Sequence, residues 1–253
     1  MRRAAAGCAL SSAYIAVKMK RDDRAVNLFR DASNRFADLR DFLRAGECAL
    51  AAARRNAPAG DDDEGVDADQ PGAEKNAEDY AQAAKVLALA VDNTKGDVDV
   101  SKARTLLARA LVGAGRAGDA VEHAKKSVAY LESCARSPGD AKLRADTHEL
   151  LADALAGAGR PREAARCLET AAGLAAAADD DAWPRRKADG AQLVFNAGAA
   201  KSKAGDHGGA AAHFETAISM YEDLGEATAA DACRGYLDHE RKLEAKGMGG
   251  IDE

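Results

Sequence analysis

The sequence predicts an all-α protein, folded as a right-handed antiparallel helical solenoid of helix pairs. A short Ala-Gly turn recurs at residues 114–116, 158–160 and 204–206, and its glycines lie 44 and 46 residues apart. Each copy lies between two stretches in which apolar residues recur at helical spacing, so the repeated unit is helix, tight turn, helix. Units of this length stack into a solenoid, because each needs its neighbour to bury its apolar face. Alanine, the strongest helix former, dominates the apolar residues, whereas aromatic residues contribute only 4%.

Helical spacing of apolar residues continues over most of the chain. The predicted helices cover residues 22–38, 42–55, 75–92, 99–114, 117–135, 141–158, 162–178, 184–204, 208–224 and 227–245. Pro161 and Pro184 lie at two helix starts, where the missing proline N–H leaves no hydrogen bond unmade. Strict pairing leaves helix 75–92 without a partner. Either residues 56–74 contain a further helix, or helix 75–92 pairs with its successor.

Helix 227–245 is expected to cap the C-terminal end of the solenoid. Its apolar residues Cys233, Leu237 and Leu243 would pack inward, while charged residues face water, as solubility requires of a terminal repeat. The charges expected to face water are those of Asp231, Arg234, Asp238, Glu240, Arg241 and Lys242.

Three segments fall outside the predicted solenoid, which covers residues 22–245. Residues 1–20 contain alanine and serine between basic ends, which favours an N-terminal helix, with a targeting segment as the alternative. Residues 58–73 are rich in aspartate and cannot bury apolar surface, which predicts a solvated, mobile loop. Its aspartates lack the order of ligands and the central glycine of a calcium loop, so we do not expect calcium there. Residues 246–253 are expected to form a flexible tail.

Composition and motifs exclude several classes of protein. The net charge of −6 does not indicate a nucleic-acid binder. Five cysteines without a C-x-x-C pair indicate reduced thiols, as in the cytoplasm, rather than disulfides or a zinc site. No stretch reaches the roughly 18 apolar residues of a membrane-spanning helix, and peripheral membrane association is left open. Because nucleophile-elbow, phosphate-loop and dinucleotide motifs are absent from the sequence, we expect a non-enzyme without cofactor or metal.

Small and aromatic residues recur where the two helices of a unit would touch. The most complete copy contains Gly198, Ala210, Phe214 and Ala217. This pattern resembles the tetratricopeptide repeat (TPR) superfamily, which implies paired antiparallel helices with a concave groove for protein ligands. Because the pattern encodes helix packing, the resemblance implies little more about function.

A more specific resemblance covers residues 22–133. Its motifs are AVNLFRDASNRF at 25–36, LRDF at 39–42, AGEC at 45–48 and AEDYAQAA at 77–84. These motifs are similar to the early helices of the soluble NSF attachment proteins (SNAPs). The resemblance implies an adaptor in vesicle fusion and intracellular protein transport, with SNARE bundles and an NSF-type ATPase as partners. The later half departs from the family, so the resemblance does not extend to stimulation of the ATPase.

The candidate groove is polar. By the TPR register, the side chains that face it are those of Asn27, Arg30, Asn34, Lys102, Arg109, Glu149, Asp153, Phe195 and Lys203. Arg30 and Asn34, four residues apart, resemble the first members of the carboxylate clamp of TPR co-chaperones, which binds through charge-assisted hydrogen bonds. Acidic Asp153 at a further clamp position would instead repel a carboxylate. The alternative is an ordinary solvated helix face.

Two functions are therefore predicted. A SNAP-like adaptor needs exposed basic groups to attract the acidic surface of SNARE bundles. The candidates are Lys102, Arg109, Arg116, Lys125, Lys126, Arg160 and Arg166. The alternative is a generic TPR co-chaperone or assembly scaffold, which would bind a peptide or chaperone tail in the groove near Arg30, Asn34 and Phe195.

Overall fold

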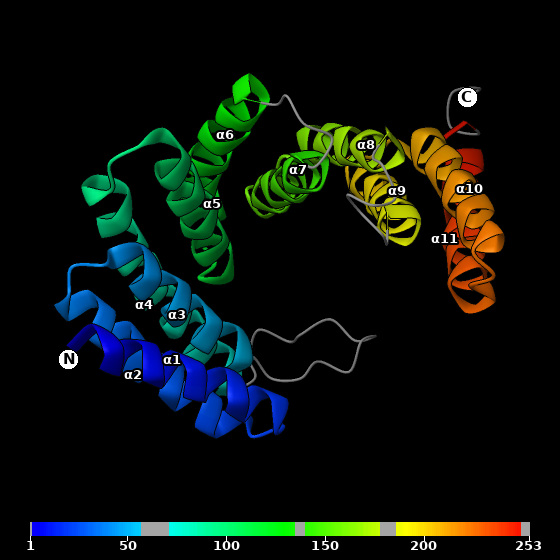
Figure 1. Ribbon diagram of the computed structural model, residues 1–253. Helices are drawn as coiled ribbons and strands as arrows, with labels where there is room; N and C mark the ends of the chain where they lie inside the picture. Colours follow the sequence, from blue (N-terminus) through cyan, green and yellow to red (C-terminus); the bar gives the residue numbers. More distant parts are fainter. Residues whose placement is uncertain (1, 57–70, 135–139, 178–185, 249–253) are drawn as a thin grey trace. The chain divides into compact units, whose positions relative to one another are not determined.

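The computed structural model describes residues 2–56, 71–134, 140–177 and 186–248 (Figure 1). These ranges contain eleven α-helices and no strand. The helices are α1 (Arg2–Lys18), α2 (Asp22–Asp38), α3 (Phe42–Asn56), α4 (Pro71–Asn93), α5 (Asp97–Gly113), α6 (Ala117–Cys134), α7 (Asp140–Gly157), α8 (Pro161–Ala177), α9 (Arg186–Lys203), α10 (His207–Asp223) and α11 (Ala227–Met248). The predicted all-α class is confirmed.

Helix boundaries differ from the predicted ones at a few positions. Helix α4 begins at Pro71 rather than at residue 75, because proline is well tolerated in the first turn of a helix. Helix α11 continues to Met248 and so includes the start of the expected tail. Pro184 and the aspartates considered for calcium, between residues 61 and 67, lie outside the described residues.

The chain forms two compact units, Met1–Ser127 and Val128–Glu253, with the boundary inside α6. In the first unit consecutive helices pack against each other in the pairs α1–α2, α2–α3, α3–α4 and α4–α5. In the second unit the corresponding pairs are α7–α8, α8–α9, α9–α10 and α10–α11. Helix α4 packs against both α3 and α5. Helix 75–92 of the prediction therefore contacts its successor as well as its predecessor, and residues 57–70, where the alternative places a further helix, lie outside the described residues.

The tight turns share one backbone conformation, in which a single residue has a positive φ. That residue is Lys20, Arg40, Gly115, Gly159, Gly205 or Gly225, with φ between 55° and 77°. At the α7–α8 turn the Arg160 N–H donates to the Leu155 carbonyl at 2.8 Å and the Gly159 N–H donates to the Ala156 carbonyl at 3.0 Å. These bonds satisfy carbonyls at the helix end, and glycine is favoured because it lacks a Cβ. The repeated Ala-Gly pattern is thus the chemical signature of this turn.

Small residues let neighbouring helices approach closely. A Cβ added at Gly198 would lie 2.9 Å from Phe214, which confirms the predicted contact between the two helices of that copy. Gly46 lies against Leu87 in the same way. In α1, Ala6, Ala9, Ala13 and Ala16 face the core of the first unit, where they pack near Phe29 and Phe36.

The predicted cap helix α11 packs as expected except at one residue. Cys233 and Leu237 are buried, but so is Glu240, which was expected to face water. The Glu240 carboxylate accepts hydrogen bonds from Ser202 Oγ and His207 Nδ1, each at 2.7 Å. The prediction was wrong here because these two donors come from α9 and α10 and replace the lost hydration.

Candidate functional site

A groove with a polar wall lies in the second unit, between α7, α8 and α9. It has a volume of about 540 Å³. Its apolar lining consists of Ala152, Ala156, Gly159, Pro161, Ala164, Leu168, Ala199 and Ala200, and its polar lining consists of Asp153, Asn196 and Lys203. Because most of the apolar side chains are single methyl groups, the helix backbones themselves form the floor. An extended peptide can therefore approach the helices closely.

The orientation of the Asn196 amide is fixed by a relay of hydrogen bonds from the adjacent helix. The Tyr221 hydroxyl donates to Gln192 Oε1 at 3.0 Å, and Gln192 Nε2 in turn donates to Asn196 Oδ1 at 3.0 Å. Burial raises the pKa of Tyr221, with Cys233 and Glu226 acting in the same direction, so its hydroxyl remains a donor. With its oxygen engaged, Asn196 offers its NH₂ group to the groove.

A second donor lies two helical turns away on the same face of α9. The Lys203 side chain is exposed and forms no ion pair within the described ranges. Lys201, two residues earlier, is by contrast paired with Glu169 at 2.9 Å. The α9 wall thus presents an amide donor and a free ammonium group, both of which require acceptors from a ligand.

Phe195, predicted to line the groove, faces a different neighbour. Its ring packs against Phe214 at 5.4 Å and Tyr236 at 5.2 Å between ring centroids. The half-buried Phe195 therefore belongs to the contact between α9, α10 and α11, although exposed Tyr236 leaves one edge of this cluster open to solvent.

The two residues of the predicted clamp have different environments in the structure. Arg30 donates two hydrogen bonds to Asp79 on α4, at 2.8 and 2.7 Å, and Asn56 Nδ2 donates to the same carboxylate at 2.7 Å. Arg30 thus helps to hold α2, α3 and α4 together, while Asn34 is exposed. His148 of α7 is buried, and burial lowers its pKa despite nearby Glu132.

The basic candidates for a SNARE-binding face fall into three groups. Three of them are paired with acids: Lys102 with Glu47 at 2.5 Å, Arg116 with Asp119 at 2.6 Å, and Arg160 with Glu163 at 2.6 Å. Lys125, Lys126 and Arg166 are exposed without an ion pair in the described ranges. Arg109 is half-buried and lies near Arg54. Burial lowers the pKa of Arg54, and the positive charge of Arg109 lowers it further, to a smaller extent.

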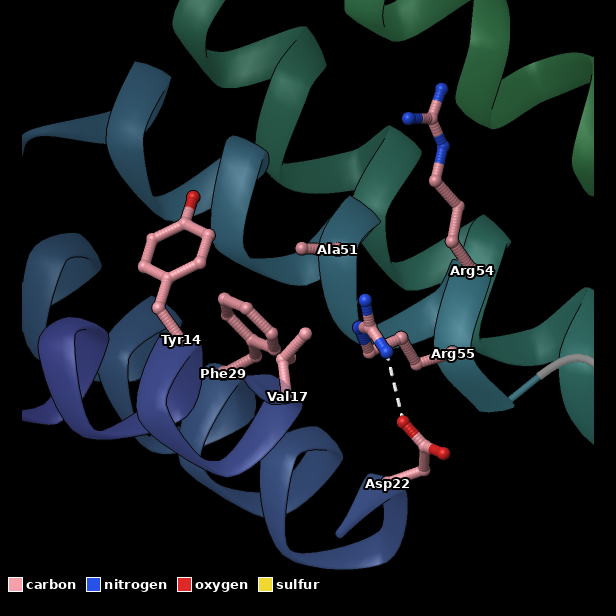
Figure 2. Close-up of a pocket in the computed structure, with 7 residues that line it drawn as sticks. All are labelled: Tyr14, Val17, Asp22, Phe29, Ala51, Arg54 and Arg55. Atoms are coloured by element: carbon pink, nitrogen blue, oxygen red, sulfur yellow. Dashed lines mark hydrogen bonds and ion pairs between the residues drawn. The ribbon is translucent and has the colours of Figure 1, made fainter. Parts of the chain in front are cut away.

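A further pocket of about 460 Å³ lies in the first unit between α1, α2 and α3 (Figure 2). Tyr14 and Phe29 form an aromatic wall, with ring centroids 5.4 Å apart. Asp22 and Arg55 close one side through an ion pair at 2.8 Å, while the Arg54 side chain extends away from that pair. Asp22 and Arg55 already satisfy each other, which leaves the Tyr14 hydroxyl and the Arg54 guanidinium as the polar groups that this pocket offers a ligand.

Among the residues that the structure describes, no group of three or more His, Cys, Asp or Glu side chains is arranged to hold a metal ion. Within the same ranges, every helix falls short of the length or the apolar character that crossing a bilayer requires.

Comparison with known proteins identifies the fold. No protein-family model matches the sequence, and no curated protein is significantly similar to it. A structure from Podosopora anserina with nearly identical kinesin-light-chain TPR-like repeats is 20% identical and covers 79% of this chain and 87% of that one, with a TM-score of 0.58. The apo form of RapI is 12% identical, covering 95% and 85%, with a TM-score of 0.55. A Rap protein complexed with Competence and Sporulation Factor is 13% identical, covering 94% and 64%, with a TM-score of 0.53. The predicted fold class is confirmed: the chain has the TPR-like helical fold.

Proposed function

We propose that the protein is an interaction adaptor that binds an extended peptide segment of a partner protein in the groove between α7, α8 and α9. The observation that carries this proposal is the combination of an open alanine floor with two unpaired donors, Asn196 and Lys203, on one wall. A TPR-like structure complexed with Competence and Sporulation Factor supports the idea that this fold accommodates such ligands.

The donors specify the chemistry of the peptide. Asn196 NH₂ suits a backbone carbonyl, and the Lys203 ammonium suits an acidic side chain or a terminal carboxylate, which must avoid Asp153 of the same groove. Small side chains would face the floor, because the alanine methyl groups leave room for the peptide backbone to lie close to the helices.

The test begins with peptides selected from a random peptide-display library on the wild-type protein. Their dissociation constants are then measured by fluorescence anisotropy for Ala156→Trp, which fills the groove, and for Lys203→Glu. We expect Ala156→Trp to abolish binding and Lys203→Glu to weaken acidic peptides at least about tenfold. Ala212→Trp, at an exposed alanine of α10 outside the groove, is the matched control. Peptides that bind all variants equally would place their site elsewhere and refute the proposal.

The more specific prediction, a SNAP-like adaptor that binds SNARE bundles in vesicle fusion, remains the second candidate. Its support is the sequence resemblance together with exposed, unpaired Lys125 and Lys126 on α6. Binding of a purified SNARE bundle and NSF to the wild type, lost in Lys125→Glu/Lys126→Glu and retained in Ala156→Trp, would favour this candidate. The opposite pattern would favour the peptide groove.

A further inference from the structure

The hairpin of α1 and α2 exposes apolar side chains that a solenoid end normally covers. Ile15 is 58% exposed and Met19 is 55% exposed. Together with half-buried Leu28 of α2, they line a small groove of about 200 Å³, in which Ala16 leaves space between the larger side chains. Large apolar side chains grouped on a surface indicate an interaction site more often than singly scattered ones do.

The same groove is surrounded by positive charge. Arg21 and Arg24 line it, and two exposed lysines flank it, Lys18 at the end of α1 and Lys20 on the turn. None of these four cations forms an ion pair within the part of the chain that the structure describes. Asp22 and Asp23 lie among these cations. The Asp22 carboxylate is engaged by Arg55 of α3 at 2.8 Å, and exposed Asp23 offsets one of the four charges, so the net charge around the groove stays positive.

Shape and charge together select one kind of occupant. A recess between two helices accepts the side-chain knobs of a third helix, as in the stacking of the repeats themselves. Two copies of this hairpin would bring eight cations together, which opposes self-association through this surface. Ile15 and Met19 line a recess rather than a protruding tip, which fits a helix better than a bilayer.

We infer that the groove between α1 and α2 is a docking site for an acidic amphipathic helix of a partner protein. The apolar face of that helix would insert a leucine-sized side chain between Ile15, Met19 and Leu28. Its flanking carboxylates would face Arg21 and Arg24. The site belongs to the first unit and is independent of the peptide groove proposed in the second.

The probe is a fluorescein-labelled helical peptide of about 18 residues, long enough for five helical turns, with leucines along one face and glutamates beside them. Anisotropy gives its dissociation constant for the full chain. We expect Ile15→Ser/Met19→Ser and Arg21→Glu/Arg24→Glu each to weaken binding by about tenfold or more. Raising the salt concentration should weaken binding to the wild type and not to the Arg21→Glu/Arg24→Glu variant. Chemical-shift changes in the backbone amide spectrum should centre on α1 and α2.

Two matched control variants distinguish binding at this site from non-specific binding to exposed apolar or basic surface. Val98→Ser/Leu143→Ser removes similarly exposed apolar side chains elsewhere, and Lys125→Glu/Lys126→Glu makes the same change of charge on α6. Both should bind the probe like the wild type, and circular dichroism should show all variants folded. The inference is overturned if a peptide of equal composition with leucines dispersed around the helix binds equally well. It is also overturned if phosphatidylserine vesicles bind the hairpin while the peptide does not.

Discussion

Replacing the buried Glu240 offers a quantitative test of how the last helix is held. The carboxylate is 2% exposed and accepts one hydrogen bond from Ser202 and one from His207, each at 2.7 Å. A hydrogen bond to a charged group contributes about 1.5–3 kcal/mol. Glu240→Ala removes both, although Ser202 and His207 then regain water. We therefore expect the free energy of unfolding of the second unit to fall by about 3 kcal/mol.

Glu240→Gln is the control of equal size. Its amide oxygen can accept from Ser202, and its NH₂ group can donate to Nδ1 of a neutral His207. The loss should stay below about 1 kcal/mol, since both contacts survive without the charge. Urea unfolding followed by circular dichroism at 222 nm measures both variants, fitted with two transitions if the units unfold separately. A loss below about 0.5 kcal/mol for Glu240→Ala, or equal losses for the two variants, would refute the reasoning.

Three further predictions concern the turns, the thiols and the histidines. Gly159→Ala should lower the free energy of unfolding by about 1–2 kcal/mol, because an alanine is strained at this positive φ; an unchanged urea midpoint would contradict the turn geometry. Burial, with Glu47 and Asp41 adding to it, raises the pKa of Cys48 to about 12, so a thiol reagent should label the exposed Cys134 quickly and Cys48 only after unfolding. Burial lowers the pKa of His148 below its usual value near 6.5. Below about pH 6.5 the unfolded state therefore binds more protons than the folded one, and stability is lost as the pH falls through that range. His148→Gln should show a smaller drop in Tm between about pH 7.5 and 5 than the wild type, whereas an equal drop would contradict this origin.

The sequence predicts helices and turns well because their chemistry is local. A glycine such as Gly159 signals a left-handed turn wherever it follows a helical pattern. The same turn at Lys20 carries no such signal, because a lysine has the positive φ there and the turn is closed by backbone hydrogen bonds from Lys20 N–H to Val17 and from Arg21 N–H to Ala16. Helix existence and most boundaries were therefore predictable, including the break between residues 20 and 22, although no glycine marks that turn.

Site residues are harder to predict because their partners come from other helices. Arg30 looks available for a ligand in the sequence, yet Asp79, 49 residues away, binds it. Asn196 was missed for the converse reason, since a polar residue on a helix suggests only solvent. Its spacing of seven residues from Lys203 on one helix face was the available signal, and only the structure shows that Gln192 engages its amide oxygen.

In the relay from Tyr221 through Gln192 to Asn196, Tyr221 determines which ligand is preferred, whereas Asn196 is the residue that contacts the ligand. A hydroxyl on α10, outside the peptide groove, decides whether α9 offers a hydrogen or a lone pair to the peptide. Without that hydroxyl, as in Tyr221→Phe, the Gln192 amide is free to rotate, and Asn196 can present its oxygen to a peptide N–H instead. The preferred ligand could then change although every residue lining the groove stays the same.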